Sequence, residues 1–221
     1  YGGWIATSFT GSENDDRDAT TQDVLDHSWE NDLRFFMFAR SGTGNTKFYG
    51  RIGTQYYRNT TSSRIIARTD WIQPTVEMMY LERSLGLKSI KHKFTLGRQY
   101  VQVKNAIAFA AVADGVSYNL KTRRQEYSAF VLHQLPGENN IDFLAPKPGR
   151  SKRWFYGMEY AWNYHPSNAV DIFTVGNLDD NDNKPDVTGQ RHEFNSNYLG
   201  ATLHGTVFAG LKYELQYIME M

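Results

Sequence analysis

The 221-residue sequence has no cysteine, no excess of charge of either sign and no long apolar run. Without cysteine, disulfide frameworks and zinc-finger sites are excluded. The 24 basic residues equal the 24 acidic ones, which argues against a nucleic-acid partner, because nucleic-acid-binding proteins show a basic excess. The longest apolar run, at 106–113, has 8 residues, whereas a membrane-spanning helix needs about 20, so transmembrane helices are also excluded.

The sequence also lacks the motifs of common enzymes and of a signal peptide. Its 6 histidines do not have the spacing of a zinc protease, and neither a nucleophile elbow nor a phosphate-binding loop occurs. We therefore expect no enzymatic activity and no cofactor. Tyr1 is not methionine, and the residues after it do not resemble a signal peptide. We expect either a protein whose leader has been removed or a piece of a longer chain.

Alternation of two side-chain phases is the dominant pattern of this sequence. It is clearest at 152–165, where one phase consists of Trp154, Tyr156, Met158, Tyr160, Trp162 and Tyr164. The other phase consists of Arg153, Phe155, Gly157, Glu159, Ala161 and Asn163. Strands of soluble proteins average about 5 to 6 residues, and the alternating stretches here are roughly twice as long. The pattern predicts an all-β protein with long strands.

The same criterion predicts about eleven strands, with boundaries uncertain by about two to four residues. They lie at 2–11, 28–40, 46–58, 74–84, 92–102, 112–122, 125–134, 152–165, 168–176, 191–204 and 206–220. Connections between them alternate between long and short, with long ones at 12–27, 59–73, 135–151 and 177–190. Strands of about 10 residues with this loop rhythm are typical of an antiparallel transmembrane β-barrel in a bacterial outer membrane.

Alternation alone does not separate such a barrel from a soluble β-sandwich, which remains an alternative. A sandwich buries its apolar phase, whereas a barrel exposes that phase to lipid and encloses its charges in a wet lumen. Strand length, loop rhythm and aromatic residues near strand ends favour the barrel. Bacterial barrels usually have an even number of strands and close on themselves. We therefore expect 1–221 to be one incomplete barrel domain with about 11–12 strands, the N-terminal part of a barrel of about 16–18, or the count to be wrong by one.

Charged residues of the second phase are the candidate pore-lining residues. The set comprises Arg34, Arg51, Arg98, Arg153, Lys47 and Lys212 together with Glu30, Asp32, Glu159, Asp171 and Glu214. Basic groups in a narrow channel would attract anions, because low-dielectric walls focus the electric field. The alternative is a ladder of cross-strand ion pairs that fills and stiffens the lumen. The choice depends on which charges remain unpaired.

Two predicted loops have distinctive compositions. Residues 177–190 contain Asp179, Asp180, Asp182 and Asp186, which are oxygen ligands of the kind calcium prefers, but the glycine and glutamate of an EF-hand are missing. This segment is a weak calcium candidate, and a solvated acidic loop is the favoured interpretation. Residues 136–151 combine three prolines with apolar residues, and could fold into the lumen or pack against a neighbouring loop.

Residues 76–122 resemble the alginate-export family of outer-membrane β-barrels. The resemblance rests on an acidic and aromatic strand with Glu77, Tyr80 and Leu81, on 96–99 with sequence LGRQ, and on 114–116 with sequence DGV. It covers about a fifth of the 221 residues with motifs of moderate specificity. It implies a many-stranded barrel that transports anionic polysaccharide or small solutes through arginine-lined pores. The chain is shorter than a complete member of that family, and its later strands are missing.

The alternation does not settle whether Arg98 in this motif faces the lipid or the lumen. Strict alternation groups Arg98 with Phe94 and Leu96, on the phase that would face lipid, where a central arginine costs about 2 to 4 kcal/mol. It must lie near the membrane boundary, follow a bulge at Gly97 or belong to the other phase. Its role is then either to meet solute in the lumen or to pair with an acid on a neighbouring strand, such as Glu77 or Glu82.

The leading functional prediction is an outer-membrane channel that passes anionic polysaccharide or small solutes by diffusion through a charged lumen. The alternative is a structural or assembly barrel whose lumen is plugged or occupied by a partner protein. Expected partners are outer-membrane lipid and lipopolysaccharide, the anionic solute, and in the second case a protein in or at the barrel. The localisation expected from these features is the outer membrane of a Gram-negative bacterium.

Overall fold

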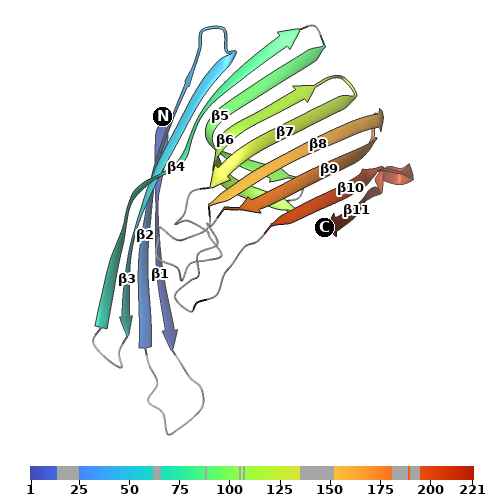
Figure 1. Ribbon diagram of the computed structural model, residues 1–221. Coiled ribbons are helices and arrows are strands. Elements are labelled where there is room, and N and C mark those ends of the chain that lie inside the picture. Colours follow the sequence, from blue (N-terminus) through green and yellow to red (C-terminus); the bar gives the residue numbers. More distant parts are fainter. Residues whose placement is uncertain are drawn as a thin grey trace, which may run out of the picture. The chain divides into compact units, whose positions relative to one another are not determined.

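A computed structural model describes residues 1–13, 25–61, 66–87, 89–104, 106, 108–134, 152–180, 189 and 195–221. One eleven-stranded antiparallel sheet runs through it, and each strand pairs with its neighbours in chain order (Figure 1). The strands are β1 (Gly2–Glu13), β2 (Leu25–Arg40), β3 (Thr46–Thr61), β4 (Ile66–Leu87), β5 (Ile90–Val103), β6 (Phe109–Lys121), β7 (Gln125–Gln134), β8 (Arg153–His165), β9 (Asn168–Asp179), β10 (Ser196–Thr206) and β11 (Lys212–Glu220). The predicted all-β class and the count of eleven strands are confirmed.

Three predicted boundaries differ from the structure by more than the expected error of about two to four residues. The long loop expected at 59–73 is largely strand, because β3 continues to Thr61 and β4 begins at Ile66. This stretch contains several threonines and isoleucines, whose β-branched side chains favour extended backbone more than the polar neighbours favour a loop. The strand expected from 206 begins instead at Lys212, after a 3-10 turn at Phe208–Gly210, and the one expected from 191 begins at Ser196. Within the described ranges, no helix is both long and apolar enough to cross a membrane.

The connections preserve a strong asymmetry in spite of these differences. In an antiparallel meander, alternate connections lie at the same end of the strands. The connections at 14–24, 135–152 and 180–195 are the three longest, and all belong to one end. The other end has the short turns at 41–45, 88–89, 122–124, 166–167 and 207–211. The expected contrast between a long-loop end and a short-turn end therefore holds for these three connections. It is broken at 62–65 and at 104–108, which belong to the same end and are as short as the turns at the other end.

The chain divides into two compact units, which are treated separately below. The first comprises Tyr1–Ala39 and Tyr49–Met79, and the second comprises Arg40–Phe48 and Tyr80–Met221. In the first unit β1 pairs with β2 from Gly2 opposite Phe36 to Glu13 opposite Leu25. On one face of this unit, Phe36 lies between Trp4 and Tyr49, with ring centroids 6.2 and 6.5 Å away.

The second unit has two faces of different character. Its packed face holds a cluster formed by Val103, Phe109, Ala113, Phe130, Leu132, Phe155, Phe173 and Val175. Phe109 stacks on Phe130 with centroids 5.2 Å apart and contacts Phe155 at 5.0 Å. Phe130 is the register partner of Gly157, and Phe173 is the register partner of Gly200. The rings occupy the space above these glycines, because a Cβ at Gly157 would clash with Phe130 and one at Gly200 would clash with Phe173.

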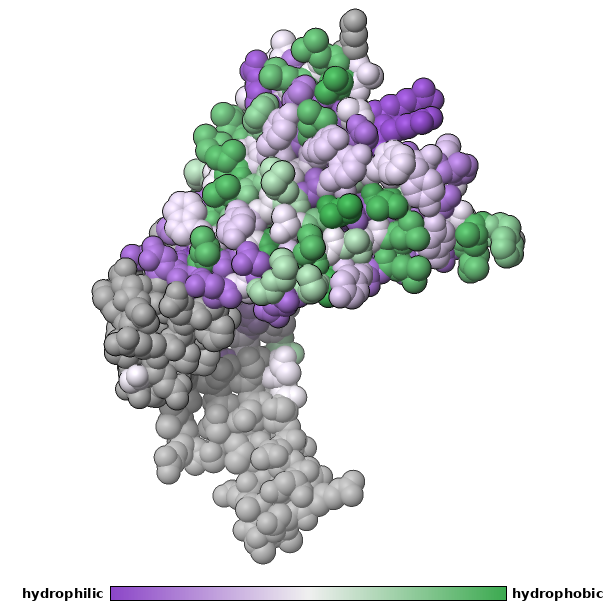
Figure 2. Space-filling view, turned by 45° about the vertical axis from the view of Figure 1, so that its right-hand side comes forward, coloured by the Kyte–Doolittle hydropathy of each residue, from purple (hydrophilic) through white to green (hydrophobic). Residues whose placement is uncertain are grey.

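The opposite, exposed face of the second unit is apolar. Its side chains alternate with those of the packed face and include Leu96, Val116, Val131, Met158, Ile172, Leu199, Leu215 and Tyr217, all more than one third exposed. In Figure 2 green and near-white side chains cover much of the coloured surface, and the deepest purple ones gather towards its margins. The two phases predicted for 152–165 separate in this way, since Met158 is 64% exposed and Arg153 and Phe155 are each 7% exposed.

Candidate functional site

An ion-paired cluster occupies one face of the first unit. Arg34 lies between two acids, with Nη2 3.0 Å from Asp32 Oδ2 and Nε 2.8 Å from Glu77 Oε1. The second oxygen of Glu77 lies 2.6 Å from Arg51 Nε. Gly53 leaves room for this carboxylate, because a Cβ there would lie 2.8 Å from Glu77 Oε1. Two arginines and two acids thus compensate one another, as the predicted alternative of cross-strand ion pairing requires.

A second cluster lies on the packed face of the second unit. Lys104 Nζ lies 2.8 Å from Glu159 Oε1 and 2.7 Å from Asp171 Oδ2. His204 Nε2 approaches the same oxygen of Asp171 at 2.9 Å. Asp171 is 1% exposed, so its charge depends on these neighbours rather than on water. Lys104 follows β5 in a left-handed conformation with φ of 50°, which is uncommon for a non-glycine residue.

Lys104 was not among the predicted site residues, and its contacts are not local. Glu159 is on β8 and Asp171 on β9, although β5 pairs with β4 and β6. Phe109, at the start of β6, likewise reaches Phe155 on β8. Lys104 and Phe109, which lie directly after β5 and at the start of β6, therefore both contact the packed face at β8 and β9. In the sequence, the only indication of this role was the position of Lys104 shortly after the strand predicted at 92–102.

Arg153 and Asp179 form a third ion pair at the long-loop end of the second unit. They are register partners on β8 and β9, both are less than 10% exposed, and Arg153 Nε lies 3.9 Å from Asp179 Oδ2. The backbone N–H of Asp179 also donates a hydrogen bond to Asn195 Oδ1. Of the weak calcium candidates, Asp180 is exposed beside it, whereas Asp182 and Asp186 lie outside the described residues. The predicted loop at 136–151 also lies outside them. Among the described residues, no three potential ligands are grouped for a metal ion.

Arg98 keeps strict alternation and lies on the exposed face. The pairing of β5 with β6 is continuous from Lys91 opposite Lys121 to Val103 opposite Phe109, so the bulge considered at Gly97 does not occur. Arg98 Nε lies 3.4 Å from Asp114 Oδ1, its register partner. Within the described part of the chain, the acid that pairs with Arg98 is therefore Asp114, and neither Glu77 nor Glu82 does so.

A basic pocket lies at the short-turn end of β4 to β7. Its lining includes Lys91, Lys93 and Lys121 with one acid, Glu126, and it encloses about 470 Å³. Glu126 Oε2 accepts a hydrogen bond from Lys121 Nζ at 2.8 Å. Lys91 and Lys93 form no ion pair within the part of the chain that the structure describes. This pocket thus has a positive surplus, which sequence reasoning did not identify because the three lysines come from two strands.

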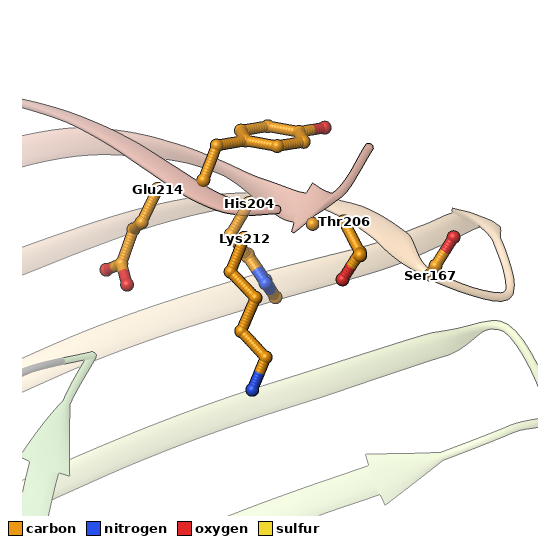
Figure 3. Close-up of a pocket in the computed structure, with 7 residues that line it drawn as sticks. Ser167, His204, Thr206, Lys212 and Glu214 are labelled. Atoms are coloured by element: carbon orange, nitrogen blue, oxygen red, sulfur yellow. The ribbon is translucent and has the colours of Figure 1, made fainter. Parts of the chain in front are cut away.

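The remaining predicted residues occupy less confined positions. Lys212 and Glu214 line an open pocket of about 390 Å³ with His204, Thr206 and Ser167, beside the turn between β8 and β9. Figure 3 shows the side chains of His204, Lys212, Thr206 and Glu214 on the same side of β10 and β11. In the second unit, Lys47 Nζ lies 5.7 Å from the ring centroid of Tyr80. Glu30 is exposed on β2.

The fold and these clusters define the class of protein: an all-β protein built on one eleven-stranded antiparallel meander. Its second unit has a largely apolar exposed face and, on the opposite face, the ion pairs of Lys104 and Arg153. No family model matches the chain, and no curated protein matches it.

Proposed function

We propose that the chain is part of a transmembrane β-barrel of a bacterial outer membrane. The observation that supports this best is the inverted arrangement of the second unit, where the exposed face is largely apolar and the opposite face contains the ion pairs of Lys104 and Arg153. A soluble sandwich places its apolar phase inside, whereas a barrel in lipid places it outside. The length of the strands and the concentration of long connections at one end support the same proposal.

An all-antiparallel barrel cannot close with these eleven strands alone, unless the first and last strands pair in parallel. In an antiparallel meander with an odd number of strands, the first and last strands run in the same direction. An antiparallel seam between β1 and β11 is therefore impossible without at least one further strand. Open edges in hydrocarbon leave backbone groups without partners, so we propose a larger barrel of about 16–18 strands.

Within this barrel we propose a diffusion path for anionic solutes. Most candidate pore-lining charges are neutralised, because Arg34, Arg51 and Arg153 all have acidic partners. The basic pocket at Lys91, Lys93 and Lys121 retains a surplus and would attract carboxylate groups at the short-turn, periplasmic mouth. The resemblance of 76–122 to alginate-export barrels agrees with an acidic polysaccharide as one solute.

Tryptophan quenching by lipid tests the membrane assignment. Trp154 and Trp162 lie on the exposed face and are 43% and 45% exposed. We expect vesicles with brominated acyl chains to quench the reconstituted protein, and the Trp154→Phe/Trp162→Phe variant to lose much of the quenched emission. Unquenched emission from a protein that remains in the aqueous phase would contradict the proposal and favour a soluble β domain.

A second candidate is a barrel whose lumen is occluded, and a specific observation favours it. Phe109, Phe130, Phe155 and Phe173 fill the packed face of the second unit, and Lys104 adds an ion pair with Asp171 on the same face. A lumen with such a filling conducts poorly. Absence of conductance, together with stable co-purification of another protein, would support this candidate over the channel.

A further inference from the structure

His204 is a titratable side chain in the ion-paired cluster on the packed face of the second unit. Its Nε2 lies 2.9 Å from Asp171 Oδ2, the oxygen that also lies 2.7 Å from Lys104 Nζ. The side chain of Asp171 is 2% exposed, whereas that of His204 is 45% exposed and lines the open pocket of about 390 Å³. The histidine thus connects a buried carboxylate to a pocket that solvent reaches.

Two carboxylates share one lysine in this cluster when the ring of His204 is neutral. Lys104 Nζ lies 2.8 Å from Glu159 Oε1 and 2.7 Å from Asp171 Oδ2, so one negative charge remains in excess. A ring nitrogen this close to a carboxylate oxygen carries a proton in both the neutral and the charged ring. Protonation at Nδ1 therefore keeps the contact with Asp171 and cancels the excess charge. The charge of the packed face changes while its contacts stay in place.

The pocket beside His204 adds no net charge to this balance. Lys212 and Glu214 on β11 line it, and Glu214 is the register partner of His204 (Figure 3). Tyr213 also lines the pocket, and a phenol is ordinarily neutral between about pH 5 and pH 8. Among ordinary side chains only histidine changes its charge in that range. The net charge around this pocket therefore depends on the protonation of His204.

We propose that His204 is a specificity-determining residue of the proposed channel and makes its anion selectivity depend on pH. The inference rests on the proposed function, in which the packed face lines the lumen. With a neutral ring, the excess negative charge at this place favours cations. Protonation cancels that charge, so the permeability ratio of anions to cations rises as the pH falls. His204 thereby acts in concert with the basic pocket at Lys91 and Lys93, which lies at the same short-turn end.

Reversal potentials in a salt gradient at about pH 5 and about pH 8 test the proposal. For the natural-length protein at low salt, we expect the anion-to-cation permeability ratio to be about twofold higher at the lower pH. His204→Gln should keep the pH 8 ratio at both pH values, and His204→Lys, with its permanent charge, should keep the pH 5 ratio. His165→Gln is the matched control, because His165 is exposed at the same end and forms no ion pair with the described residues. It should retain the full pH response.

The outcomes separate this inference from the proposed function. A conducting channel with the same selectivity at both pH values would overturn the role of His204 and leave the channel standing. A natural pH response in His204→Gln, or its loss in His165→Gln, would also overturn that role. If His204→Gln does not insert, the natural protein and His204→Lys decide the test, because their ratios must differ at pH 8 and agree at pH 5. Silence of the natural protein at both pH values would refute the proposed channel itself.

Discussion

Lys104 Nζ lies 2.7 Å from Asp171 Oδ2, although the two residues are separated in the sheet by β6, β7 and β8. This contact holds Lys104, directly after β5, against the packed face of the second unit. It also compensates a buried carboxylate, since Asp171 is 1% exposed. The same contact therefore both positions Lys104 and neutralises the charge of Asp171.

Removal of this lysine should destabilise the protein strongly. Lys104→Met leaves Glu159 and Asp171 close together without their shared cation, and breaking a buried pair costs about 3 to 5 kcal/mol. The free energy of unfolding from urea titration in detergent or lipid measures the effect. Lys212→Met is the matched control, because Lys212 is exposed and forms no ion pair with the described residues, so it should change the free energy by no more than about 0.5 kcal/mol. Equal losses in both variants would contradict the structural role of Lys104.

The cluster around Glu77 should influence ion selectivity in a predictable direction. Glu77→Gln leaves Arg34 and Arg51 with Asp32 as their charged partner in the cluster, which adds one positive charge to the proposed lumen. We expect the anion-to-cation permeability ratio to rise about two- to threefold at low salt. Arg51→Gln should change the ratio in the opposite direction. Reversal potentials that move the same way in both variants would show that these charges do not face the conduction path.

The basic pocket should determine block by an acidic polymer. Lys91→Gln/Lys93→Gln removes the two lysines that have no ion pair among the described residues. We expect the polyuronate concentration for half-maximal block to rise about tenfold at low salt, and the difference to vanish near 1 M salt because of screening. Arg123→Gln, at the exposed turn beside the pocket, controls for general loss of positive charge. Similar block in the double variant and the natural protein would exclude this pocket from solute binding.

The exposed face should tolerate charge in water but not in lipid. Met158 is 64% exposed, so Met158→Arg in a soluble protein should change stability by about 0.5 kcal/mol or less. In a bilayer the same substitution should cost about 2 to 4 kcal/mol if it lies near the midplane. Unfolding titrations in vesicles compare it with Ser89→Arg, at the exposed turn between β4 and β5. Equal, small effects would argue that Met158 faces water.

Alternation predicted the strands well because side chains in a strand point to opposite faces with a period of two residues. It placed Arg153 and Glu159 on one face and Met158 on the other without knowledge of the fold. It failed at 59–73, where β-branched residues extended two strands into an apparently polar loop. These outcomes depend on local backbone preference, which is encoded within a few residues.

Partners of the charged residues could not be predicted in the same way. Which acid meets Arg98 or Arg51 depends on strand register, and which acids meet Lys104 depends on where the end of β5 lies relative to β8 and β9. Both are tertiary properties that the spacing of Lys104, Glu159 and Asp171 in the sequence does not contain. The positive surplus at Lys91 and Lys93 likewise could not be predicted, because it depends on which acidic residues pair with other basic residues in the folded structure.

Reversal potential in a planar bilayer tests the central claim most directly. The natural-length protein is purified in detergent and inserted between two potassium chloride solutions of different concentration, and a polyuronate is then added on the short-turn side. We predict stable conductance, a reversal potential displaced towards that of chloride, and block by the polymer. A silent bilayer, or a preference for potassium that the polymer does not affect, would contradict an anion-conducting outer-membrane channel.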